Sequence, residues 1–128
     1  MTVEARKSPQ GRFLTELTAG DARWLADADQ PAGGAGTAPD PHQLLDAALA
    51  ACTSITVRMY AERKGMALDD VQVAINHVEE GGVYRIDRKV TLVGRLDEAE
   101  RKRLLEIANK CPIHKALSGR FEIATRTE

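Results

Sequence analysis

The sequence has few aromatic residues, only two cysteines and no excess of charge of either sign. Aromatic side chains make up 4% of the 128 residues, and the net charge is −1 with acids and bases mixed along the chain. No basic patch of the kind that binds nucleic acid or an anionic membrane is therefore expected. The N-terminus has no apolar leader-like stretch, and we expect no later stretch to approach the roughly 20 apolar residues that span a bilayer. These absences predict a soluble cytoplasmic protein without nucleic-acid or membrane partners.

The two cysteines are informative because cytosolic thiols stay reduced unless a disulfide is transient and redox-active. Three roles therefore remain for Cys52 and Cys111: core packing, metal binding or thiol chemistry. The length and the 43% hydrophobic content are usual for one globular fold, so we expect a single domain over residues 1–128.

Hydrophobic patterning predicts an α+β fold with the order ββ, α, ββ, αα, β. The first hairpin is expected over Phe13–Thr18 and Ala22–Ala26, followed by a long surface loop from Asp27 to Asp40 that is rich in Gly, Ala, Pro and Asp. Loops of this length in compact domains are often functional.

The strongest local signal is the start of a long helix. Asp40 as N-cap, Pro41 at the first helical position and Gln43 three residues after the cap resemble a capping box, and Gly65 closes the helix. Apolar residues then recur at spacings of three and four, at Leu45, Ala48, Cys52, Ile55 and Met59. A helix of about 24 residues is about 36 Å long, more than a domain of this size comfortably covers. The exposed part of this stripe favours a dimer.

Two antiparallel strands and two further helices are expected next. The strands contain alternating apolar residues at Val71, Val73, Ile75, Tyr84, Ile86, Val90 and Leu92. Asp97 and Glu100 repeat the capping-box spacing, and Pro112 ends that helix because it cannot continue the hydrogen-bond ladder. A short helical turn to Leu117 and a last strand around Phe121 and Ile123 complete the order.

Taken singly, neither cysteine settles its own role. Cys52 stands in an ordinary helical sequence and is most simply a buried core residue. At Cys111, Pro112 would open a new helical turn whose unpaired backbone N–H groups favour a thiolate. Both cysteines with His42 and His114 could be imagined as a zinc set, but the Cys-x-x-His step lacks a matching second pair. No lysine has the apolar surroundings that would make its amine a nucleophile. The sequence predicts no cofactor and no metal.

The segment from Asp40 to Thr53, DPHQLLDAALAACT, resembles the long helix of the family that unites osmotically induced protein C (OsmC) and the organic hydroperoxide resistance (Ohr) proteins. The segments RMYAERKG at 58–65 and ANKCPIH at 108–114 resemble its continuation and the family's second cysteine motif. The resemblance runs from about Gly11 to the C-terminus. It implies antiparallel sheets packed around a long central helix, in an intertwined homodimer with two active sites at the subunit interface.

The resemblance also implies a thiol-dependent peroxidase active in the oxidative stress response. Cys52 would attack an organic hydroperoxide or hydrogen peroxide and become a sulfenic acid, and Cys111 would close a redox-active disulfide that a lipoyl-type or small-thiol dithiol reductant reopens. In relatives an arginine from the N-terminal strand region contacts the attacking sulfur. By position this residue is Arg12, with Arg23 second.

One position departs from the peroxidase pattern. Relatives hold that arginine with a glutamate near the helix start, where this chain has His42. Asp46, one turn later, could substitute for the glutamate, but as a shorter acid at a displaced position it would aim the arginine differently. The alternative function is a non-catalytic dimeric stress protein or small-molecule binding module that keeps the fold.

Overall fold

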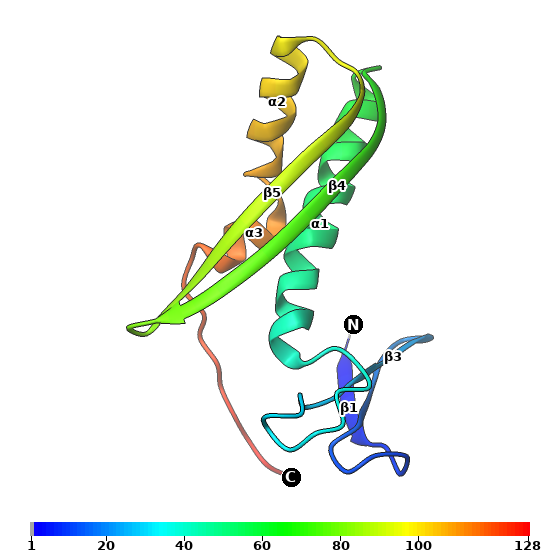
Figure 1. The fold of residues 1–128 in the computed structure, drawn as a ribbon, viewed down its shortest axis with the longest axis vertical. Helices are drawn as coiled ribbons and strands as arrows, with labels where there is room; N and C mark the ends of the chain where they lie inside the picture. The colour runs from blue at the N-terminus through cyan, green and yellow to red at the C-terminus, as the bar shows by residue number, and fades with distance from the viewer. Residues whose placement is uncertain (1) are drawn as a thin grey trace. The chain divides into compact units, whose positions relative to one another are not determined.

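A computed structural model describes residues 2–128 and divides the chain into two compact units, Met1–Asp46 and Ala47–Glu128 (Figure 1). In chain order the elements are β1 (Val3–Lys7), β2 (Thr15–Ala19), β3 (Ala22–Ala26), α1 (Pro41–Arg63), β4 (Ala67–Glu80), β5 (Val83–Arg95), α2 (Glu98–Ala108) and α3 (Pro112–Leu117). Both sheets are antiparallel, so the predicted α+β class is confirmed. The single domain over 1–128 stays a prediction beside this division into two units.

The N-terminal unit is built on a three-stranded sheet in the order β1-β2-β3. The predicted hairpin of β2 and β3 is confirmed, and its two-residue turn places Gly20 at a φ of +59°, which glycine adopts without the steric cost that a side chain brings. β1 was not predicted. Its sequence, VEARK, contains only two apolar residues in alternation, Val3 and Ala5, which is too short a pattern to predict a strand, and all five residues are exposed.

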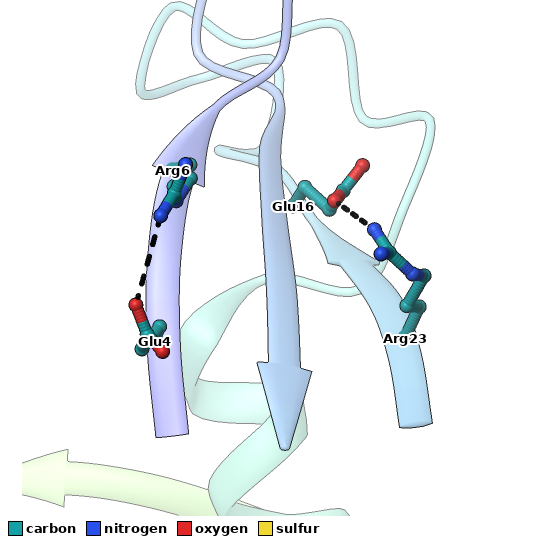
Figure 2. A network of polar contacts seen from close by, with 4 residues as sticks. All are labelled: Glu4, Arg6, Glu16 and Arg23. Atoms are coloured by element: carbon teal, nitrogen blue, oxygen red, sulfur yellow. Dashed lines mark hydrogen bonds and ion pairs between the residues drawn. The ribbon is translucent and has the colours of Figure 1, made fainter. Parts of the chain in front are cut away.

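Exposed ion pairs lie on this sheet, as Figure 2 shows. Arg23 on β3 donates to Glu16 on β2 over 2.8 Å, and Arg6 lies 3.9 Å from Glu4 on β1. Pairs this exposed contribute about 0–1 kcal/mol each to stability. Arg23 therefore has a local carboxylate partner.

The predicted loop between β3 and α1 is confirmed and is held by the buried Asp27. Its carboxylate accepts hydrogen bonds from the Thr37 backbone N–H (3.2 Å), the Thr37 hydroxyl (3.0 Å) and the Ala28 N–H (2.8 Å). The Thr37 N–H leads the groups that lower the pKa of Asp27, against the opposing effect of burial. The loop thus has a fixed path around one carboxylate.

α1 begins at the predicted capping box. The Asp40 carboxylate accepts from the Gln43 N–H over 2.9 Å, and the Gln43 side chain accepts from the Asp40 N–H over 3.0 Å. The helix ends before Gly65, whose φ of +67° favours glycine. The face of α1 that is buried within the chain consists of Leu49, Thr53, Val57 and Ala61.

The predicted apolar stripe lies on another face of α1 and is largely exposed. Ile55 keeps 49% of its surface exposed and Met59 keeps 62%. By length and composition α1 also meets the criterion for a membrane-spanning helix, with a mean hydropathy of 1.2 over an 18-residue window. The expectation that no stretch approaches such a span was therefore wrong on this criterion. One such helix is weak evidence for a membrane, since core helices of soluble proteins pass the same test.

The C-terminal unit is built on the long β4–β5 hairpin, which runs alongside α1 and α2 in Figure 1. The strands pair from Ala67 opposite Arg95 to Glu80 opposite Val83, so the two predicted antiparallel strands are confirmed. Side chains alternate between the two faces of a strand, and on the inner face Val73, Val90 and Leu92 pack against the buried core. The buried core consists of Val57, Ala61, Val71, Leu104, Ile107 and Ala108.

α2 and α3 follow as predicted, but the last strand does not form. Asp97 and Glu100 make a reciprocal capping box at the start of α2, and α3 begins at Pro112. Residues 120–128 form no strand, and Ile123 is 87% exposed. Phe121 and Ile123 supply the alternation of a strand, yet within the described chain no sheet edge pairs with them. A strand forms only where its backbone groups find a partner.

Candidate functional site

The two cysteines lie on different elements of the C-terminal unit. Cys52 is half-buried near the middle of α1, where its Sγ lies 3.9 Å from Thr56 Oγ1. Cys111 is fully buried and is the N-cap of α3, with its Sγ accepting from the His114 backbone N–H over 3.2 Å. Pro112 at the first helical position turns the chain here, as the sequence indicated.

The thiol groups are brought together. Burial raises the pKa of Cys52, but hydrogen bonds from the Ile113 backbone N–H, the Cys111 thiol and the Thr56 hydroxyl outweigh it, so the pKa lies below its usual value. Hydrogen bonds to the charged form favour that form, and a thiolate is the nucleophilic form of cysteine. Both cysteines carry free thiols. The Cys111 thiol is thus close enough to Cys52 to hydrogen-bond its sulfur, while the roles of Cys52 and Cys111 stay predictions.

Sequence reasoning missed Arg88, on β5. Its guanidinium donates to Thr53 Oγ1 (3.0 Å), to the Ala108 carbonyl (3.3 Å) and to Asn109 Oδ1 (2.6 Å), and its Nη2 lies 3.2 Å from His114 Nδ1. These partners flank both cysteines in the sequence. A signal was present, because Arg88 falls in the same alternation as the inward-facing residues of β5.

The contact with Arg88 fixes the tautomer of His114. A guanidinium has only donors, so the Nδ1 atom that lies 3.2 Å from Arg88 Nη2 must accept. The proton of the neutral imidazole is then on Nε2. His114 therefore presents an N–H donor on the other side of its ring.

A cavity of about 250 Å³ lies beside Arg88 within the same unit. Apolar and aromatic side chains make part of its wall, and polar ones the rest; its lining residues are Leu49, Tyr84, Ile86, Arg88, His114, Leu117 and Ser118. Apolar walls with a few converging polar groups are typical of small-molecule sites. A larger hollow of about 750 Å³ along residues 7–12 belongs to the N-terminal unit and contains no cysteine or histidine.

The predicted arginines belong to the N-terminal unit. The guanidinium of Arg12 lies over the Phe13 ring, 4.9 Å from its centre, and Arg23 pairs with Glu16. A contact of Arg12 or Arg23 with Cys52 stays a prediction. His42 is exposed on the first turn of α1.

The imagined zinc set has no support in the geometry. Within residues 2–128, no three or more histidine, cysteine, aspartate or glutamate side chains gather closely enough to hold a metal ion. Catalytic zinc sites in proteins use at least three such ligands.

The fold and the site define a class: a small α+β protein with one cysteine on a long helix and a second at a helix start. The chain belongs to the OsmC-like protein family, whose model matches residues 33–126. No protein of curated function matches the chain.

Solved structures with this fold come from several bacteria. An osmotic stress induced and detoxification response protein from Psychrobacter arcticus has a TM-score of 0.78 at 21% identity, covering 91% of this chain and 87% of its own. The organic hydroperoxide resistance protein OsmC of Legionella pneumophila has a TM-score of 0.66 at 24% identity, covering 92% and 88%. OhrB of Bacillus subtilis, also an organic hydroperoxide resistance protein, has a TM-score of 0.61 at 22% identity, covering 92% and 90%. These likenesses confirm the fold.

Proposed function

We propose that this chain is a cytoplasmic thiol-dependent peroxidase that reduces organic hydroperoxides or hydrogen peroxide. The observation that carries the proposal is the contact between the Cys52 and Cys111 thiols, with the pKa of Cys52 lowered despite partial burial. Membership of a family that includes organic hydroperoxide resistance proteins supports the peroxide as substrate.

The reaction has three balanced steps. The Cys52 thiolate attacks one peroxide oxygen, the O–O bond breaks, and the other oxygen leaves with a proton as alcohol or water, so that Cys52 becomes a sulfenic acid. The Cys111 thiol then gives up its proton and attacks the Cys52 sulfur, the S–S bond forms, and the S–O bond breaks, so that the oxygen leaves as hydroxide and takes up that proton to become water. A dithiol of the lipoyl or small-thiol type finally reduces the disulfide and is itself oxidised to a disulfide.

The functional unit we propose is a homodimer. Within one chain, Ile55 and Met59 form an exposed apolar strip on α1. The family resemblance implies that a second copy of the chain buries this strip. Equilibrium ultracentrifugation of the full chain should give twice the mass of one chain. A monomer at micromolar concentration would contradict this part of the proposal.

The test of function is consumption of cumene hydroperoxide and of hydrogen peroxide by the reduced protein, first with dithiothreitol and then with dihydrolipoamide. Cys52→Ser should abolish turnover, and Cys111→Ser should stop the cycle after one equivalent of peroxide unless the external thiol takes over the second step. Arg12→Gln should lower the rate of peroxide attack, with Arg23→Gln as the matched variant, since Arg23 is paired with Glu16. No turnover by the unaltered protein with either reductant would overturn the proposal.

A second candidate, a non-catalytic binding module, is favoured by two observations. His42 occupies the position where peroxidase relatives have a glutamate, and the cavity beside Arg88 and His114 offers a bounded volume for a small molecule. This candidate predicts ligand-dependent thermal stabilisation that persists in Cys52→Ser. Peroxide turnover lost with Cys52 would reject it in favour of the enzyme.

A further inference from the structure

Arg88 occupies an unusual place for a charged side chain. It lies on β5 in the alternation that points Ile86 and Val90 toward the helices, opposite Ile75 on β4. A guanidinium placed among apolar neighbours must find hydrogen-bond partners, since an unpaired buried charge is strongly destabilising. Its position on the inner face of β5 therefore requires Arg88 to form hydrogen bonds with residues of the helices.

The contacts of Arg88 join three separate elements. Thr53 is on α1, Ala108 and Asn109 are at the end of α2, and His114 is on α3. Thr53 follows Cys52 directly in the sequence, and the partners on α2 and α3 lie on either side of Cys111. One guanidinium thus bridges the segments that carry both sulfurs.

Each partner is suited to holding this bridge. Thr53 is fully buried and donates its hydroxyl proton to the Leu49 carbonyl over 2.7 Å, so its oxygen is oriented to accept from Arg88. The Ala108 carbonyl lies at the C-terminal end of α2, where the partial negative charge of the helix favours a cation. The His114 backbone N–H binds Cys111 Sγ while its ring contacts Arg88.

We propose that Arg88 is a positioning residue that holds residues 108–114 against α1 and thereby sets the approach of the Cys111 sulfur to the Cys52 sulfur. The inference rests on the proposed function for the origin of the Cys52 sulfenic acid, but the closing of the disulfide itself does not depend on it. In the closing step the Cys111 thiol loses its proton and its sulfur forms the S–S bond, while the S–O bond of the sulfenic acid breaks and the oxygen leaves with that proton as water. The rate of this step depends on the effective concentration of one sulfur near the other.

Arginine is needed here rather than a simple positive charge. Its planar fork offers five donors in fixed directions, four of which meet the partners named above, whereas a lysine ammonium offers three donors from one point. Lysine at this position should therefore restore the charge without restoring all the contacts. Rescue by lysine should be partial.

The experiment compares Arg88→Gln, Arg88→Lys and Asn109→Ala with Arg85→Gln as the matched control, an exposed arginine on the same strand. Two quantities are measured on protein shown by far-UV circular dichroism to be folded. The first is the rate of disulfide closure after one equivalent of cumene hydroperoxide, with dimedone trapping of the open sulfenic acid. The second is the equilibrium constant for the Cys52–Cys111 disulfide against glutathione, which needs no peroxide turnover.

Arg88→Gln should lower both the closure rate and the disulfide equilibrium constant about tenfold or more, because the effective concentration of the two sulfurs falls. Arg88→Lys should lie between Arg88→Gln and the unaltered protein, and Arg85→Gln should match the unaltered protein. Folded Arg88→Gln with unaltered values for both would overturn the proposal. If Arg88→Gln does not fold, Asn109→Ala decides, and unaltered values there would overturn it.

The two proposals fail in different ways. A protein that turns over no peroxide, yet whose glutathione equilibrium shifts with Arg88, would refute the peroxidase and support the positioning role. A protein with full turnover and the same closure rate in all folded variants would support the peroxidase and refute the positioning role.

Discussion

Replacing Thr53 by valine tests the contacts around the cysteines through stability. Thr53 has no exposed surface, and its hydroxyl oxygen accepts from Arg88 over 3.0 Å. Valine keeps the shape of the side chain but can neither accept from Arg88 nor donate to the Leu49 carbonyl, so the half-buried guanidinium loses one hydrogen bond and the hydroxyl's own bond to Leu49 is lost with it. A hydrogen bond to a charged group contributes about 1.5–3 kcal/mol, and Thr53→Val should lower the free energy of unfolding by about this amount.

Serine provides the matched variant, because it keeps the hydroxyl and removes only a methyl group. Thr53→Ser should cost about 1 kcal/mol, the transfer energy of one buried methyl. Urea unfolding at pH 7 measures both, and thermal melting should shift by about 4 °C for each kcal/mol in a chain of this size. If Thr53→Val is as stable as the unaltered protein, or if serine costs as much as valine, packing and not the hydrogen bonds of the Thr53 hydroxyl accounts for this position.

Three further predictions concern the thiol, the loop and the core. Cys111→Ala should raise the pKa of Cys52, since it removes one hydrogen bond to the thiolate; the pH dependence of iodoacetamide alkylation measures this, and an unmoved midpoint would contradict it. The folded-state pKa of Asp27 is lowered by Thr37, so its contribution to stability is present above about pH 4 and is lost as pH falls through the folded-state pKa. Asp27→Asn should thus destabilise at pH 7, with the difference shrinking toward pH 2 in urea titrations; a constant difference would refute the assignment. Leu104→Ala should cost about 2–5 kcal/mol by urea unfolding, because Leu104 is fully buried, and a loss below 1 kcal/mol would argue against this core.

Local sequence signals predicted the elements that depend on local chemistry. The capping boxes at Asp40 and Asp97 form because each joins residues three apart, so the sequence alone contains both partners. Pro112 ends one helix and starts another for an equally local reason, and the sequence therefore predicted Cys111 at a helix junction.

The parts that sequence did not predict depend on distant partners. Arg88 stood in an inward position of β5, yet Thr53 and Asn109 lie 35 and 21 residues away, and only tertiary packing brings them to it. The strand expected around Ile123 also depended on a distant partner. Its residues alternate as in a strand, but within residues 2–128 no sheet edge pairs with them. Side-chain pattern predicts which face a residue takes, not which partner it meets.

The groups that lower the pKa of Cys52 all lie in one part of the chain. Its pKa is lowered by Ile113, Cys111 and Thr56, all in the C-terminal unit, whereas Arg12 and His42 belong to the N-terminal unit. We therefore expect Arg12→Gln to leave the hydrogen bonds that lower the pKa of Cys52 in place. If Arg12 acts, it acts on the peroxide or on the developing charge of the leaving oxygen rather than as the sole source of the thiolate. We therefore expect His42, at the position of the family glutamate, to affect the rate of peroxide attack and to leave the disulfide chemistry proposed for Cys52 and Cys111 in place.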